Sequence, residues 1–209
     1  MVTAIGRAMN RLVAHAPITW PLMRAPMRAY FDRRAKGWDD RTGAGSAEHL
    51  APLAAALLHV DPAPERALDI GTGTGTGALL IAREFPQARV RGVDLSEEMI
   101  RLAQGRIGLD PDGRVAFRVA DASSLPWDDD SFDLVVQLNM TPFFAETARV
   151  LRPGGYAIAA TSWGASTPFY TPPSVLERGF RRRGLDPVRS GEAGRGTYTV
   201  VRAPAATPR

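Results

Sequence analysis

The run Leu68–Ala78 reads LDIGTGTGTGA, and it decides the fold. Hydrophobic residues lead directly into four glycines at alternate positions, Gly71, Gly73, Gly75 and Gly77, and an apolar stretch follows. Glycine lets the backbone turn tightly and lets a ligand approach the main chain, while the amide groups at the start of a helix point at the polar part of that ligand. The run therefore predicts a strand, a nucleotide-binding turn and a helix.

The residues around the glycines indicate which class of nucleotide the turn binds. No Gly-Lys-Ser/Thr follows, which excludes a P-loop. Gly73-x-Gly75-x-x-Ala78 fits the relaxed dinucleotide fingerprint, and Asp94, about 20 residues further on, suits the hydroxyls of a ribose. Asp69 separates the remaining alternatives, because its carboxylate would repel a diphosphate and attract an ammonium group. This favours a ligand that is cationic at one end and adenosyl at the other, such as S-adenosylmethionine, over a nicotinamide cofactor.

The composition is that of a single globular chain. Of its 209 residues 44% are hydrophobic and 23% charged, which excludes wholesale disorder. Cysteine is absent, so disulfides, thiolate metal sites and a cysteine nucleophile are excluded, and with only three histidines we expect no metal site. The net charge is +4, but Lys36 is the only lysine among 26 basic residues. We interpret that bias as the mark of a GC-rich bacterial coding sequence.

Strand and helix patterns alternate after the stiff segment Asp61–Pro64. The alternation predicts an α/β fold with a mostly parallel seven-stranded sheet and helices on both faces. Strands are expected at 66–70, 88–94, 114–120, 132–138, 156–161, 185–189 and 197–202. Helices are expected at 75–85, 96–104 with Ser96 as its cap, 142–151 and 174–183. Asp133, near the start of one of these strands, is interpreted as a structural carboxylate.

Residues 1–60 are expected to form an N-terminal helical cap on a main domain of residues 61–209. Helices are predicted at 29–38 and, from Ser46 as N-cap, at 47–60. The segment between Pro17 and residue 29 is predicted to be broken into short pieces, because it contains Pro17, Pro21 and Pro26.

The first 31 residues contain four arginines and no acidic residue. Apolar residues at helical spacing predict a short amphipathic helix up to Pro17, which fits a lid on the main domain, a helix on a membrane surface or a frayed tail. Nothing in the sequence fits a secretory signal or a membrane span, so we expect a cytoplasmic bacterial protein.

Five segments in order resemble the motifs of class I S-adenosylmethionine-dependent methyltransferases, over roughly residues 66–162. They are Asp69-x-Gly71-x-Gly73-x-Gly75, Val93–Ser96, Ala120–Ala122 with Leu125-Pro126, Phe132–Val136 and Leu151–Gly155. In addition, Tyr30–Asp39 is similar to the entry helix of quinone-biosynthesis and related small-molecule methyltransferases. The resemblance implies a Rossmann-like class I methyltransferase fold and S-adenosylmethionine as cofactor.

The resemblance also implies a set of cofactor-binding residues. The methionine moiety would contact Asp69, Gly71, Gly73 and Gly75, and the ribose would contact Asp94. The adenine would lie between Leu95, Met99, Asp121 and Ala122. Gln137 and Asn139 would line the passage of the methyl group, and Trp38 would act as a lid.

The reaction implied is in-line displacement on the sulfonium methyl group, for which alignment and water exclusion matter most. No motif requires a metal. Catalytic candidates are His15, His49 and Tyr30, which lie in segments able to cover the pocket, whereas His59 is expected on the opposite side.

The first interpretation of function is methyl transfer to a small organic acceptor, a specialised metabolite or a quinone-like ring. Its pocket would be built from residues 1–60 and the loop Trp163–Pro173. The alternatives are methylation of RNA or protein, a nicotinamide-dependent oxidoreductase and a cofactor-binding protein without catalysis. No aromatic residues interleave the basic run Arg181–Arg183 to stack bases, which argues against nucleic acid. The sequence does not indicate an oligomeric state.

Overall fold

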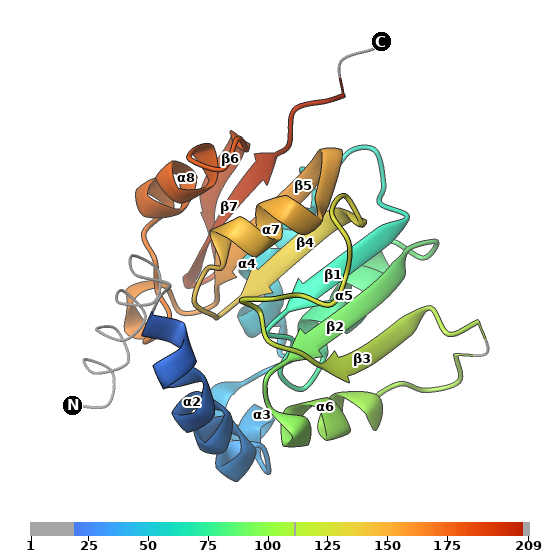
Figure 1. The fold of residues 1–209 in the computed structure, drawn as a ribbon. Helices are drawn as coiled ribbons and strands as arrows, with labels where there is room; N and C mark the ends of the chain where they lie inside the picture. The colour runs from blue at the N-terminus through green and yellow to red at the C-terminus, as the bar shows by residue number, and fades with distance from the viewer. Residues whose placement is uncertain (1–18, 111, 207–209) are drawn as a thin grey trace.

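The computed structural model describes residues 19–110 and 112–206 (Figure 1). Its centre is a seven-stranded sheet in the order β3-β2-β1-β4-β5-β7-β6. Neighbouring strands from β3 to β5 are parallel, and β7 runs antiparallel to both β5 and β6. The strands are β1 (Arg66–Ile70), β2 (Arg89–Asp94), β3 (Val115–Val119), β4 (Phe132–Leu138), β5 (Leu151–Thr161), β6 (Asp186–Ala193) and β7 (Gly196–Arg202). The predicted Rossmann-like α/β fold is confirmed.

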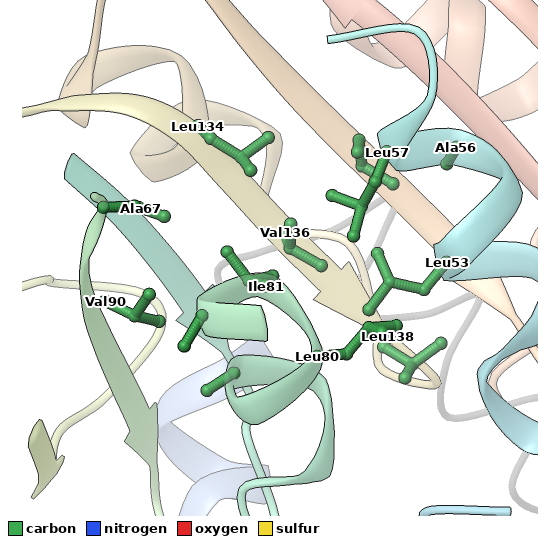
Figure 2. Close-up of a cluster of buried hydrophobic side chains, with 14 of the residues drawn as sticks. Leu53, Ala56, Leu57, Ala67, Leu80, Ile81, Val90, Leu134, Val136 and Leu138 are labelled. Carbon is green, nitrogen blue, oxygen red and sulfur yellow. The ribbon is translucent and has the colours of Figure 1, made fainter. Parts of the chain in front are cut away.

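Helices cover both faces of the sheet (Figure 1). One face packs against α4 (Ala47–Leu57), α5 (Thr76–Glu84) and α6 (Glu97–Gln104), and the other against α7 (Phe144–Val150) and α8 (Pro173–Arg181). Every residue of β4 is buried, as expected for a central parallel strand covered on both sides. Figure 2 shows side chains of α4 and α5 meeting those of β4 in the first of these two cores.

The predicted starts of two helices are confirmed. Ser46 Oγ accepts a hydrogen bond from His49 N at 3.1 Å, and Ser96 Oγ accepts one from Met99 N at 3.1 Å. Each serine satisfies an amide group that the first turn of the helix leaves without a partner.

The prediction that prolines break the segment before residue 29 is wrong for the described part. A single helix, α2, runs over Trp20–Arg34 with Pro26 inside it. Pro21 lies in the first turn, where no N–H is needed. Pro26 has no N–H, so the carbonyl of Leu22 loses its hydrogen bond within the helix. Leu22 is 79% exposed, so water can donate to this carbonyl instead.

The helix predicted at 29–38 is also corrected. The chain leaves α2 at Arg34 and begins a new helix, α3 (Trp38–Thr42), after Gly37 in the left-handed conformation. Strand β5 starts five residues earlier than predicted, at Leu151, because the Pro-Gly-Gly segment stays within the strand, where its pairing with β4 shifts register.

The helix predicted up to Pro17 lies outside the described residues. Within the described part of the chain, no helix is both long enough and apolar enough to span a membrane.

The fold predicts a sharp contrast between two leucines near the end of α4. Leu53 is 0% exposed and belongs to the core in Figure 2, whereas Leu58 is 83% exposed. Leu53→Ala should lower the free energy of unfolding by about 2–5 kcal/mol, since it leaves a cavity. Leu58→Ala should change it by less than about 0.5 kcal/mol. Urea unfolding followed by circular dichroism measures both, and equal losses would contradict the packing described here.

Candidate functional site

A cavity of about 900 Å³ opens at the carboxyl ends of the parallel strands. The turns after β1, β2 and β4 form its floor, while α2, α3 and the segment after β5 line it from above. In Figure 1, α2 lies beyond the tips of these strands. Open parallel sheets bind ligands at this edge, where the strand order reverses between β1 and β4.

The glycine turn gives the cavity an open main-chain surface. Gly71, Gly73 and Gly75 have φ angles of 67°, 52° and 86°, which side chains rarely adopt. A Cβ on Gly71 would lie 2.7 Å from Met140 Sδ, whereas a Cβ on Gly73 would meet nothing within 4 Å. The backbone of Gly73 therefore faces space that a ligand can fill.

Asp94 joins the glycine turn to the start of α6. Its Oδ2 accepts a hydrogen bond from Gly73 N at 2.9 Å, and its Oδ1 accepts one from Ser96 N at 2.9 Å. Burial raises the pKa of this carboxyl, and the backbone donors partly offset that effect. An ionised carboxylate offers about four acceptor positions, so both oxygens retain capacity for donors in the cavity.

Asp69 is the most deeply buried carboxylate that lines the cavity. Its Oδ2 accepts a hydrogen bond from Thr72 Oγ1 at 2.6 Å, while its buried Oδ1 has no hydrogen-bond partner. Burial raises the pKa of Asp69 to about 7. A cation placed near it would restore the ionised form, because an opposite charge lowers the pKa of a carboxyl.

His49 and Asn139 form a polar group at the end of β4. Asn139 Oδ1 accepts from Ser162 N at 2.8 Å, which orients the amide, and its Nδ2 lies 2.7 Å from Ser162 Oγ and 3.4 Å from His49 Nε2. Burial lowers the pKa of His49, which favours the neutral ring. The amide donor at Nε2 favours the tautomer with its proton on Nδ1, which leaves a lone pair on Nε2.

Helix α2 is held on the rest of the molecule mainly by polar contacts. Trp20 Nε1 donates to Asp121 Oδ1 at 2.7 Å, and Arg24 lies 3.7 Å from the other oxygen of that carboxylate. Ser96 Oγ donates to Asp32 Oδ1 at 2.5 Å. In α2, all of which the structure describes, Trp20 is the only buried residue.

Aromatic side chains close the cavity from two directions. The ring of Phe31 contacts those of Tyr30 and Trp38 edge-on, at 5.3 and 5.5 Å, and stacks at 6.3 Å on Phe169 from the segment after β5. Trp163, from the same segment, lies edge-on to His49. The cap and the segment after β5 therefore share one aromatic roof over the cavity.

Residues 67–155 match a protein family described as a methyltransferase domain. The matched segment, which is less than half of the chain, is a class I S-adenosylmethionine-dependent methyltransferase domain. A phthiotriol/phenolphthiotriol dimycocerosates methyltransferase from Mycobacterium ulcerans is 34% identical over 118 residues, 53% of this chain and 42% of that protein. A ubiquinone/menaquinone biosynthesis C-methyltransferase from Geobacter sulfurreducens is 37% identical over 102 residues, 44% of this chain and 40% of that protein.

The fold of this methyltransferase domain is found in solved structures as well. A SAM-dependent methyltransferase from Aquifex aeolicus has a TM-score of 0.65 at 19% identity, and the match covers 82% of this chain and 97% of that one. At that identity the likeness concerns the fold alone. The chain spans less than half the length of the two curated relatives.

Most residues expected to bind a cofactor in the methyltransferase domain line the cavity. They are Trp38, Asp69, Gly71, Gly73, Asp94, Leu95, Met99, Ala122 and Asn139. The catalytic candidates His49 and Tyr30 line it too, while His15 lies outside the described residues. His59 points elsewhere, as predicted, with Nε2 3.3 Å from Tyr198 Oη.

Three expected cofactor-binding residues do not line the cavity. Gly75 packs against Phe117 at the start of α5. Gln137 is buried, donates to Thr147 Oγ1 at 2.8 Å and accepts from Phe143 N at 2.9 Å. Both oxygens of Asp121 contact α2, Oδ1 through Trp20 and Oδ2 through Arg24. Oδ1 also accepts a hydrogen bond from Ser123 N in its own loop, at 2.8 Å.

Asp133 has the structural role that the sequence predicted. One of its oxygens accepts hydrogen bonds from Glu65 N and Arg66 N, at 2.9 and 2.8 Å, and the other pairs with Arg152. It lies at the amino end of β4, away from the cavity.

Sequence reasoning missed several residues of the cavity. Trp20, Met140 and Arg195 line it, and none belongs to a motif. Arg195 comes from the hairpin between β6 and β7, where no local pattern indicates a ligand. The acid-free segment around Trp20 contained the one usable signal, since its tryptophan needs a partner for the indole N–H.

The contact between Trp20 and Asp121 predicts how firmly α2 is attached. Trp20→Phe keeps an aromatic ring against Phe143 but removes the hydrogen bond to the carboxylate. Such bonds contribute about 1.5–3 kcal/mol, so amides of α2 should exchange with solvent about tenfold faster. Hydrogen exchange read by mass spectrometry measures this.

The matched control is Arg24→Gln, which removes only the longer contact of a side chain that is 59% exposed. It should speed exchange in α2 by less than about fivefold. If both variants exchange α2 at the wild-type rate, the hydrogen bond does not hold the helix.

Proposed function

We propose that the chain transfers a methyl group from S-adenosylmethionine to a small organic acceptor, with residues 1–60 as the cap and 61–209 as the catalytic domain. The observation that carries the proposal is the cavity in which Asp69, Asp94 and the open backbone of Gly73 share one wall. A nicotinamide dinucleotide fits this wall less well, because its diphosphate would lie near the buried carboxylate of Asp69.

The cavity suits the three parts of S-adenosylmethionine. Asp69 places a buried carboxylate in the wall of the cavity, whose charge a nearby ammonium group can offset. Asp94 has acceptor capacity for two ribose hydroxyls. Leu95, Met99 and Ala122 supply an apolar surface for a purine ring. When bound, the cofactor supplies a methyl group on a positively charged sulfur, already activated for transfer.

The chain's own residues would align the partners and exclude water. The aromatic roof of Phe31, Trp38 and Phe169 covers the cavity, and water exclusion with alignment can lower such a barrier by about 7–11 kcal/mol. His49 is kept neutral by burial and lines the cavity, and its Nε2 could take a proton from an acceptor hydroxyl only after releasing the Asn139 amide that donates to it. Asn139 orients that imidazole.

The role of Asp94 is tested by Asp94→Asn. The amide keeps the shape of the side chain but loses the charge, so affinity for S-adenosylhomocysteine should fall by about tenfold or more, since hydrogen bonds to a charged acceptor are worth about 1.5–3 kcal/mol. Calorimetric titration measures the affinity, and circular dichroism verifies the fold.

The control for this variant is Asp133→Asn. It neutralises a carboxylate at the amino end of β4, so it should reduce stability and leave the affinity unchanged. An unchanged affinity in Asp94→Asn would remove Asp94 from the ribose site.

The raised pKa of Asp69 predicts a pH dependence of cofactor binding. A bound ammonium group favours the ionised carboxylate, so binding below a pKa of about 7 must release a proton. Affinity for S-adenosylhomocysteine should therefore fall by about fivefold between pH 7 and pH 6. Asp69→Asn should bind more weakly at pH 7 and lose this dependence, and an identical pH profile in both proteins would contradict the assignment.

A further inference from the structure

The cavity contains more space than one nucleoside ligand needs. Its volume of about 900 Å³ is near the upper end of the ~300–1,000 Å³ usual for small-molecule sites. The wall described above accounts for one side. The rest of the lining includes six large side chains from outside that wall, Met23, Met27, Tyr30, Phe143, Trp163 and Phe169. These side chains are thioether or aromatic, so they suit the flat apolar body of a second molecule.

The charged residues of the cavity are divided by sign. Among the described residues, its only carboxylates are Asp69 and Asp94, and both belong to the wall with the glycine turn. The other charged side chains that line it are Arg33, Arg41 and Arg195, all exposed at its rim. A protonated amine would meet three positive charges on entry, whereas a carboxylate or phenolate would be attracted.

Arg195 is the rim arginine best placed to bind an anion. Its guanidinium lies over the ring of Trp163 at 5.3 Å, and Trp163 in turn lies edge-on to the buried His49. None of the ion pairs in the described part of the chain includes Arg33 or Arg195, so both charges remain available, and of these two only Arg195 also lies over an aromatic side chain of the cavity. Arg41, by contrast, donates to the backbone carbonyls of Arg34 and Lys36.

We propose that the methyl acceptor is an apolar, ring-containing molecule with a negatively charged group, and that Arg195 binds this group at the rim of the cavity. The proposal rests on the methyltransferase function proposed above and specifies its substrate class. The ring enters between the aromatic and thioether side chains, and the stacked guanidinium offers a planar pair of donors to the anion.

Three naphthalene probes of matched size test the charge preference: 2-naphthoate as anion, 2-naphthalenemethanol as neutral compound and 2-naphthylmethylamine as cation. Each is titrated calorimetrically into the full chain, with and without S-adenosylhomocysteine. We expect 2-naphthoate to bind about tenfold more tightly than the neutral probe, and the cation to bind most weakly. Equal affinities, a preference for the cation or no binding of any probe would overturn the proposal.

Arg195→Gln identifies the residue responsible. It should abolish the preference for 2-naphthoate over the neutral probe, while Arg183→Gln, an exposed arginine beyond α8 and outside the cavity, should retain it. A preference that survives in Arg195→Gln would overturn the role of Arg195. The same titrations report binding of S-adenosylhomocysteine. If S-adenosylhomocysteine does not bind, the proposed function is contradicted. The charge preference is then taken from the titrations without S-adenosylhomocysteine.

Discussion

The turn from β1 into α5 is the constraint on which the rest of the site depends. In this turn Gly71, Gly73 and Gly75 all have positive φ angles. The turn also links the carboxyl ends of β1 and β2, because Thr72 N donates a hydrogen bond to Val93 O at 2.8 Å. Asp94 fixes the same turn from the side through Gly73 N. A side chain at Gly71 would collide with Met140, so the turn also sets how closely the loop after β4 approaches. The shape of the cavity follows from these contacts.

Helices α2 and α3 are attached to the rest of the molecule in a different way from α4, which packs in the hydrophobic core. The helices that cover the two faces of the sheet pack through apolar side chains. Helices α2 and α3 are attached through carboxylates instead. Trp20 of α2 donates to Asp121, and Asp39 of α3 accepts from Thr74 Oγ1 at 2.7 Å. Polar contacts at a partly exposed interface are weaker than core packing and depend on solvent. An element held in this way can separate from the domain without unfolding it.

The alternating part of the fold was predictable because its signals are local. The apolar run of β4 and the serine caps at Ser46 and Ser96 act within a few residues, and the structure reproduces them. The errors arose where distant contacts decide. Pro26 stays in a helix because the exposed side of α2 tolerates a lost bond, and Gln137 turns into the interior because Thr147 and Phe143 N satisfy its amide. Asp121 turns to α2 because its carboxylate accepts from Trp20, 101 positions away, and the sequence around Asp121 gives no sign of that donor.

The wall formed by Asp69, Asp94 and the glycine turn is expected to bind an adenosyl ligand with a cationic end. The most direct test is calorimetric titration of the full chain with S-adenosylmethionine, S-adenosylhomocysteine and NAD in parallel at pH 7.5. We expect micromolar binding of both sulfur compounds and no binding of NAD. Binding of NAD alone, or of none of the three, would contradict it.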